Sequence, residues 1–272
     1  MTRRDQIVVV KLGGNAMTDD VIRKFAANVV ALRNQGMLPI VVHGGGPQID
    51  QALAASGISV EFANGRRVTS KEALLVVESV LMDRVNHDIV AEISNAGCEA
   101  VGLSGKKDHL FSGTRMGPVF VGPDRRPVDY GFVGEPDEVH ADILSGYIIS
   151  GLIPVIAPIG VGKHGETLNM NADTVAGAIA GALKADHFIL MTNVDGVLDK
   201  EKRLIPHLTE QQAKDLIADG TISGGMVPKV ETAIVAVEKG ANSAIIIDGR
   251  IDIALEMNDF INRKTGTSIT SC

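Results

Sequence analysis

Short, almost wholly apolar segments recur along this chain, and they limit the folds that it can adopt more than any other feature. The segments are rich in Val, Ile and Leu, and most of them lack the apolar–polar alternation of a half-exposed strand. Continuous apolar runs of this kind are typical of strands that are buried on both faces of a parallel sheet. Six segments fit this description: residues 7–11, 39–43, 99–103, 153–159, 187–192 and 244–248.

Segments with helical spacing of apolar residues separate these strands. Asp19 and Ser70 stand where N-caps are expected, and glycines follow several segments at positions where a helix should end. Strands that alternate with helices predict an α/β fold with a mainly parallel sheet. Only residues 105–135, rich in Gly and Pro, interrupt this order, and we interpret them as a loop or hairpin near the site. The predicted helices cover residues 20–35, 47–57, 70–96, 136–150, 172–185, 209–219, 227–239 and 251–263.

Composition excludes several classes of protein. The 272 residues are 45% apolar, which is too high a share for a disordered chain, and the net charge of −7 argues against a nucleic-acid partner. Cys98 and Cys272 form no disulfide framework. The longest uncharged stretch, residues 143–162, is interrupted by Pro154, Pro158 and several glycines, so no membrane span is expected. We therefore expect a soluble, cytoplasmic protein.

Glycine-rich loops follow the first two predicted strands. Lys11 precedes Gly13 and Gly14, and three consecutive glycines, 44–46, follow His43. Ligands of parallel α/β sheets bind beyond the carboxyl ends of the strands, where glycines let backbone N–H groups approach an anion. Two such loops, one with a lysine, predict an anion site. A single histidine at a strand end more often has a structural role, and His and Cys show no metal-ligand spacing.

Three further segments carry polar residues at positions suited to ligand contact. Residues 64–69 place two arginines before a helix, where they could grip a carboxylate or form a solvated surface pair. Residues 169–173 contain two Asn and one Asp, although Asn171 could equally cap a helix. Lys229 follows a glycine pair in the first turn of a helix, where a cation opposes the helix dipole and an anion nearby is expected.

Together these segments resemble the amino-acid kinase superfamily and, within it, the acetylglutamate kinases. The resemblance spans essentially the whole chain and is carried by residues 10–17, 42–49, 64–69, 169–173, 225–229 and 248–250, in family order. It implies a three-layer αβα sandwich with a central, mainly parallel eight-stranded sheet. Residues 1–183 would bind N-acetyl-L-glutamate and form a homodimer, and residues 184–272 would bind ATP, on a single continuous sheet.

The resemblance also implies a reaction and a set of site residues. The reaction is ATP-dependent phosphorylation of the γ-carboxylate of N-acetyl-L-glutamate in arginine biosynthesis, with Mg²⁺ accompanying ATP and no protein metal ligands assigned. Lys11, Lys229 and Asp173 would be catalytic, and Gly45, Gly46, Arg67 and Asn169 would bind the substrate. The nucleotide and its phosphates would contact Gly13, Gly14, Asn193, Val194, Gly196, Val197, Gly224, Gly225 and Met226.

One departure from the family concerns regulation. Arginine-inhibited relatives carry an N-terminal helix that links dimers into a hexamer, and only ten residues precede Lys11 here. Those relatives also place a His and a Glu where Ile253 and Asn258 stand in this sequence. We therefore expect a dimer that is insensitive to arginine.

Three alternatives remain open at this stage. One methylene changes discrimination in a pocket by only about 1–3 kcal/mol, so a kinase acting on an N-acetylated or carrier-bound α-aminoadipate is a close competitor. A non-catalytic sensor of the same fold is disfavoured because both lysines and Asp173 are retained. An NAD-dependent oxidoreductase lacks its glycine fingerprint after the first strand.

Overall fold

An eight-stranded sheet forms the centre of the molecule. The structure is a computed structural model, and it describes residues 6–13, 17–121, 125–250 and 265–271. The sheet order is β14-β16-β15-β13-β1-β2-β10-β5. Its strands are β1 (Gln6–Leu12), β2 (Met37–His43), β5 (Ala100–Ser104), β10 (Ile153–Ala157), β13 (His187–Thr192), β14 (His207–Thr209), β15 (Ala244–Asp248) and β16 (Thr267–Thr270).

The six strands expected from the apolar runs are all present and run parallel to one another, which confirms the mainly parallel sheet. The two further strands, β14 and β16, lie at one end of the sheet, where β16 is antiparallel to β15. The sheet crosses the expected boundary at residue 184 without a break, because β1 pairs with β13 through Val8 and His187. Residues on either side of that boundary therefore share one rigid platform.

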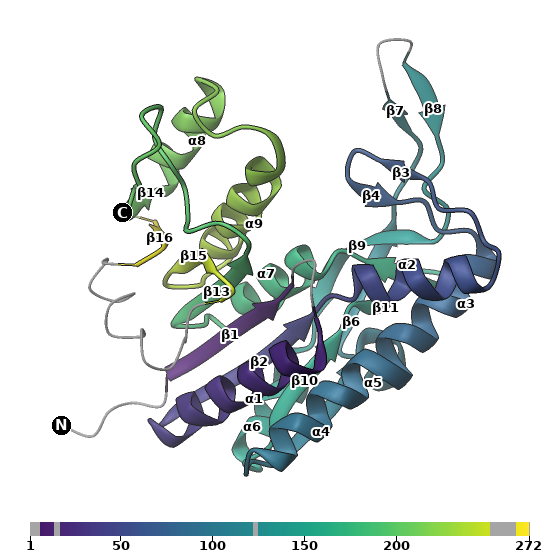
Figure 1. Cartoon of the computed structure of the whole chain (residues 1–272), viewed down its shortest axis with the longest axis horizontal. Helices are drawn as coiled ribbons and strands as arrows, with labels where there is room; N and C mark the ends of the chain where they lie inside the picture. The colour runs from purple at the N-terminus through teal and green to yellow at the C-terminus, as the bar shows by residue number, and fades with distance from the viewer. Residues whose placement is uncertain (1–5, 14–16, 122–124, 251–264, 272) are drawn as a thin grey trace.

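Helices cover both faces of the sheet, which makes three layers (Figure 1). Neighbouring residues of β1 show why the strands are continuously apolar: Val8 and Val10 pack on one face, whereas Val9 packs on the other. The first face is covered by α1 (Asp19–Asn34), α2 (Gly46–Ala55), α3 (Lys71–Ser79), the π-helical turn η1 (Val80–Asn86) and α4 (His87–Asn95). The second is covered by α6 (Ala141–Ile149), α7 (Ala172–Ala182), α8 (Glu210–Ala218) and α9 (Val227–Glu238).

Two predicted elements are wrong in detail. Residues 136–139, expected to begin a helix, belong to strand β9 (Val133–Val139), which pairs with β6 (Phe111–Arg115) next to a register shift that accommodates Pro136. The expected strand 153–159 ends at Ala157, and after Pro158 the chain enters another sheet as β11 (Ile159–Gly162). In both places tertiary pairing overrides the local pattern.

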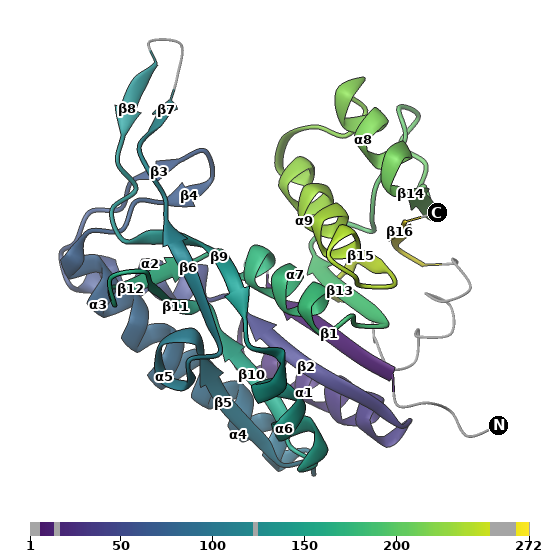
Figure 2. The same cartoon turned by 180° about the vertical axis from the view of Figure 1, so that it is seen from behind.

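A smaller β-structure continues beyond the carboxyl ends of β2 and β10. A four-stranded barrel is built from β6, β9, β11 and β12 (Thr167–Met170), next to the short helix α5 (Gly105–Asp108). Two hairpins project from it side by side, β3 (Phe62–Ala63) with β4 (Arg66–Arg67), and β7 (Val119–Val121) with β8 (Arg126–Val128), as Figures 1 and 2 show. Residues 105–135 were expected to be a loop or hairpin; the β7–β8 hairpin agrees with this, but the segment also contains α5, β6 and the start of β9.

Of the two predicted N-caps, Ser70 is confirmed and Asp19 is not. The side chain of Ser70 accepts a hydrogen bond from the Ala73 N–H and caps α3, as expected. Asp19 is instead the first residue of α1, whose N-cap is Thr18. None of the helices within the described ranges is long and apolar enough to cross a membrane.

The two-faced core predicts a large difference between two isoleucines. Ile40 in β2 is fully buried, whereas Ile149 at the end of α6 is 85% exposed. Ile40→Ala should lower the free energy of unfolding by about 2–5 kcal/mol, and Ile149→Ala should change it by less than about 0.5 kcal/mol. Urea unfolding followed by circular dichroism measures both. Equal losses would contradict the packing described above.

Candidate functional site

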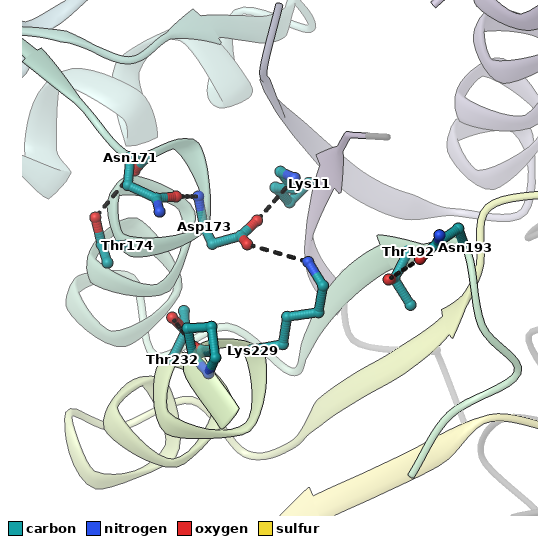
Figure 3. Close-up of polar contacts among 9 residues, drawn as sticks. Lys11, Asn171, Asp173, Thr174, Thr192, Asn193, Lys229 and Thr232 are labelled. Atoms are coloured by element: carbon teal, nitrogen blue, oxygen red, sulfur yellow. Dashed lines mark hydrogen bonds and ion pairs between the residues drawn. The ribbon is translucent and has the colours of Figure 1, made fainter. Parts of the chain in front are cut away.

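A three-residue charge cluster joins the two parts of the chain. The Nζ atom of Lys11 lies 2.8 Å from Oδ1 of Asp173, and the Nζ atom of Lys229 lies 3.5 Å from Oδ2 of the same carboxylate. Figure 3 shows the two lysines approaching Asp173 from different elements. All three residues were expected to be catalytic, and the fold brings them together although they are far apart in the sequence.

Each member of the cluster is held by regular structure. Lys11 lies on β1 between Val42 of β2 and Leu190 of β13, so the hydrogen bonds of two neighbouring strands fix its backbone. Asp173 lies in the first turn of α7, where the helix dipole favours a negative charge. Lys229 extends from the first turn of α9. The three charges therefore sit on rigid elements rather than on loops.

Asn171 caps the helix that carries Asp173. Its Oδ1 accepts a hydrogen bond of 2.8 Å from the N–H of Asp173, which confirms the capping alternative for this residue. Thr174 adds a hydroxyl bond of 2.9 Å to the carbonyl of Asn171 (Figure 3). The cap orients the first turn of α7 and hence the direction in which the Asp173 carboxylate points.

Burial and charge act in opposite directions on Asp173. Burial raises the pKa of its carboxyl group, but the ammonium groups of Lys11 and Lys229 outweigh burial and lower the pKa below its usual value. The carboxylate is therefore ionised at neutral pH. It carries one negative charge against two positive charges, so the cluster has a net positive charge that an anionic ligand can use.

Gly13 provides space for the Lys11 side chain. A Cβ atom built on Gly13 would lie 1.8 Å from the Nζ atom of Lys11 and 2.7 Å from its Cε atom. Because Lys11 Nζ is held by Asp173, a side chain at position 13 would displace the ammonium group from the cluster. Packing against Lys11 therefore gives one reason for glycine at position 13. The expected contact of Gly13 with phosphate stays a prediction. Gly14 lies outside the described residues.

The residues expected to bind the substrate line a pocket next to this cluster. It has a volume of about 180 Å³, and its walls include Gly45, Gly46, Arg67 and Asn169. The two glycines come from the N-terminus of α2, Arg67 from β4 and Asn169 from β12. Four residues predicted from three separate motifs therefore line one cavity. A second cavity of about 270 Å³ lies along α7 and α9 and includes Asp173 and Asn171 in its walls.

Arg67 is pre-positioned in the pocket. Its Nη1 atom lies 2.6 Å from Oδ1 of Asp50 on α2, and its guanidinium carbon lies 4.8 Å from the centre of the Phe62 ring. The side chain is almost fully buried, whereas that of Asp50 is half exposed. A guanidinium has five N–H donors, so the contact with Asp50 leaves donors for a ligand carboxylate. The sequence motif did not reveal Asp50, because the pairing depends on the position of the β3–β4 hairpin.

Asn169 is oriented by Thr69, which was not among the predicted site residues. The side-chain amide of Asn169 lies 3.2 Å from Oγ1 of Thr69, and this hydroxyl donates to the Arg67 carbonyl at 3.1 Å. Thr69 is fully buried. Its backbone N–H bonds the Tyr130 carbonyl, and its carbonyl accepts from the Phe132 N–H. These bonds connect the segments that carry Arg67 and Asn169.

His43 has the structural position that its sequence context favours. It is fully buried below the glycine loop 44–46, and burial lowers its pKa to about 4, although the bond to the Gly44 carbonyl opposes this. The ring is therefore neutral at pH 7. A neutral, solvent-excluded imidazole that contacts no pocket is unsuited to proton exchange with a substrate.

One of the expected nucleotide residues, Asn193, lies on the Lys229 side of the cluster. Asn193 follows β13, and Figure 3 shows it with Thr192 across Lys229 from Asp173. Val194 is partly exposed, whereas Val197 is buried and its N–H donates to Oγ1 of Thr267 at 2.8 Å. Gly224, Gly225 and Met226 form a 3₁₀ turn, η2, immediately before α9. Their contacts with a nucleotide stay predictions, as does any role of Gly196.

The residues on which the expected arginine insensitivity depends lie outside the described part of the chain. They are Ile253 and Asn258, and the predicted helix 251–263 also lies outside the described residues. Within the described ranges, no group of three or more His, Cys, Asp or Glu side chains is arranged to hold a metal ion.

Comparison with known proteins places the chain in a family of phosphotransferases. The profile of the Amino acid kinase family matches residues 6–248, and the chain belongs to that family. Acetylglutamate kinase from Bradyrhizobium sp. strain BTAi1 is 48% identical over 269 residues, which cover 97% of this chain and 90% of that protein. Acetylglutamate kinase from Rhodopseudomonas palustris strain BisB18 has the same identity and coverage.

Solved structures share the fold over the whole chain. The protein smu.665 from Streptococcus mutans UA159 superposes with a TM-score of 0.76 at 30% identity, covering 98% of this chain and 99% of that one. Carbamate kinase from Giardia lamblia bound to AMP-PNP gives a TM-score of 0.71 at 19% identity, covering the same shares, and supports the fold alone. These similarities confirm the αβα amino-acid kinase fold expected from the sequence.

The charge cluster predicts a pH-dependent contribution to stability. Asp173→Asn leaves two lysines without their shared carboxylate and should lower the free energy of unfolding at pH 7 by about 1.5–3 kcal/mol. The pKa of Asp173 is lowered in the folded state, so its contribution is present above the unfolded value of about 4 and is lost as the pH falls through the folded pKa. Urea unfolding of both proteins from pH 3 to pH 7 measures this. A difference that stays constant below pH 4 would contradict it.

Proposed function

We propose that this chain is an acetylglutamate kinase, which transfers the γ-phosphoryl group of ATP to the γ-carboxylate of N-acetyl-L-glutamate in arginine biosynthesis. One observation carries the proposal: two lysines converge on Asp173 beside a pocket lined by glycine backbone, Arg67 and Asn169. The 48% identity to acetylglutamate kinases over nearly the whole chain supports the same activity. The product is N-acetyl-L-glutamyl 5-phosphate.

The chemistry of the acceptor explains the composition of the site. A γ-carboxylate has a pKa near 4.3 and is already ionised at pH 7, so the nucleophile needs no general base. The obstacle is repulsion between this anion and the triphosphate. A site that acts by positioning and charge stabilisation suits that problem. The net positive charge at Lys11, Lys229 and Asp173 is suited to this role.

Each part of the site receives a distinct task in this proposal. Arg67 and Asn169 bind the α-carboxylate side of the substrate, and Gly45 and Gly46 hold its reacting end. Lys11 stabilises the transferring phosphoryl group, and Lys229 stabilises the leaving phosphate. Asp173 orients both ammonium groups through its two oxygens, at 2.8 and 3.5 Å.

ATP is assigned to the part of the chain after residue 183. Asn193, Val194, Gly196 and Val197 would contact the nucleotide, and Gly224, Gly225 and Met226 would lie near its phosphates together with Gly13 and Gly14. We propose that Mg²⁺ accompanies ATP, since this ion is commonly bound by substrate phosphates and water and neutralises charge on them.

The function is tested by acyl-phosphate formation. The purified protein is incubated with ATP and Mg²⁺, and the product is trapped with hydroxylamine. N-acetylglutamate should be the best acceptor among N-acetylglutamate, glutamate, aspartate, N-acetylaminoadipate and carbamate. A higher kcat/KM for N-acetylaminoadipate would favour the related kinase that differs by one methylene.

Lys229 provides the sharpest mutational prediction. Lys229→Ala should lower kcat by at least about 10²–10³-fold, the usual loss for one preorganised charge-stabilising donor. The fold should persist because the side chain is a quarter exposed and packs at the site rather than in the core. Lys24→Ala, at an exposed position of α1, is the matched control. Steady-state kinetics and circular dichroism of both variants decide the role.

The resemblance further supports a cytoplasmic homodimer in which residues 1–183 form the subunit interface. We also propose that arginine does not inhibit the enzyme. Sedimentation should give the mass of a dimer, and millimolar arginine should leave the rate unchanged. A hexamer that is inhibited by submillimolar arginine would contradict both statements.

A further inference from the structure

A π-helical turn interrupts the long helical segment that lies beneath the glycine loop 44–46. Residues 70–96 were expected to form one regular helix, but Val80–Asn86 adopts π geometry between α3 and α4. Such turns add a residue to the helical repeat and rotate the following side chains, and they are frequent at functional sites. Here the turn directs the buried side chains of Leu81 and Val85 toward the start of α2, and that of Asn86 toward β2, β5 and β10.

Two of these side chains form the floor under Gly45. A Cβ atom built on Gly45 would lie 2.7 Å from Cδ2 of Leu81 and 3.5 Å from Cγ2 of Val85. The loop backbone thus rests directly on the π turn, and a side chain at position 45 would require Leu81 to shift. Leu81 also lines the substrate pocket, so the turn and the pocket share a wall.

The third side chain, Asn86, reaches the loop through His43. The Nδ2 atom of Asn86 lies 3.0 Å from Nε2 of His43 and 2.9 Å from the carbonyl oxygen of Val155 on β10. The Nδ1 atom of His43 lies 2.8 Å from the carbonyl oxygen of Gly44. A carbonyl only accepts, so Nδ1 carries the proton and Nε2 accepts from the amide of Asn86. Both side chains are buried.

The Gly44 carbonyl determines the direction of a ligand-binding group. In a planar trans peptide the carbonyl of Gly44 and the N–H of Gly45 point in opposite directions. Because His43 binds this carbonyl on the core side, the Gly45 N–H points away from the core, and Gly45 lies in the wall of the pocket. We propose that Asn86 is a positioning residue for the acceptor site: through His43 it sets the peptide plane that presents the Gly45 N–H to the substrate carboxylate. This inference rests on the proposed function.

The surroundings of Asn86 leave little freedom for another arrangement. A Cβ atom built on Gly102 of β5 would lie 2.1 Å from Oδ1 of Asn86, so glycine is needed there for the amide to fit. With β5 on one side and the Val155 carbonyl on the other, the amide is held in one orientation. The π turn, β5 and β10 together define the position of His43.

Kinetics of one variant test the inference. Asn86→Leu keeps the size of the side chain and removes the amide, and Asn95→Leu, on the exposed part of the same helical segment, is the matched control. Asn86→Leu should raise the KM for N-acetylglutamate about tenfold and lower kcat, while the KM for ATP changes by less than about twofold. The control should match the unaltered enzyme. An unchanged KM for N-acetylglutamate, or an equal rise in both KM values, would overturn the inference.

A measurement on the unaltered protein covers the case in which the variant does not fold. Nitrogen-15 NMR of histidine-labelled protein should show His43 with its proton on Nδ1 and no titration between pH 5 and pH 9. Replacing each of the other six histidines by Gln in turn assigns the remaining signals. A proton on Nε2, or titration near pH 6.5, would overturn the arrangement. If the unaltered protein does not phosphorylate N-acetylglutamate, the proposed function fails, whereas the NMR result still decides the His43–Asn86 geometry.

Discussion

The carboxylate of Asp173 is the contact on which the arrangement of this site depends. Lys11 comes from the first strand and Lys229 from a helix more than two hundred residues later. Both ammonium groups lie within 3.5 Å of the Asp173 carboxylate, and without this shared counterion the two positive charges would repel each other. Asp173 can fill that place because it lies in the first turn of α7, capped by Asn171 and held ionised by the two ammonium groups. The cluster thereby connects both parts of the continuous sheet while keeping a net positive charge.

This local positive charge resolves an apparent conflict in composition. The chain carries a net charge of −7, yet the proposed reaction brings together two anions. The fold concentrates Lys11, Lys229 and Arg67 beside one pocket and adds uncharged donors from the glycine loop of α2. Gly13 and the loop 44–46 have different contacts. Gly13 makes room for the Lys11 side chain, whereas Gly45 rests on the π turn and Gly44 is bound by buried His43.

Local pattern predicted the parts of this protein that local physics controls. The buried parallel strands, the caps at Ser70 and Asn171, and the glycine loops could all be recognised because burial and backbone geometry restrict residue choice there. Errors arose where distant pairing decides. Residues 136–139 became a strand because β6 lies beside them, and 153–159 was divided because the chain changes sheets after Pro158. Asp50, Thr69 and Asn86 were missed because their partners lie 17, 100 and 43 residues away.

By itself the sequence determined the class of fold, the family and the identity of the charged and glycine residues at the site. These follow from patterns within short segments and from the order of motifs. Only the tertiary structure decided which residues share a cavity, that one carboxylate contacts two lysines, and that a π turn lies under the glycine loop 44–46. The physical reason is that an ion pair or a buried hydrogen bond needs two groups a few ångströms apart, and that distance is set by the packing of helices on the sheet rather than by separation along the chain.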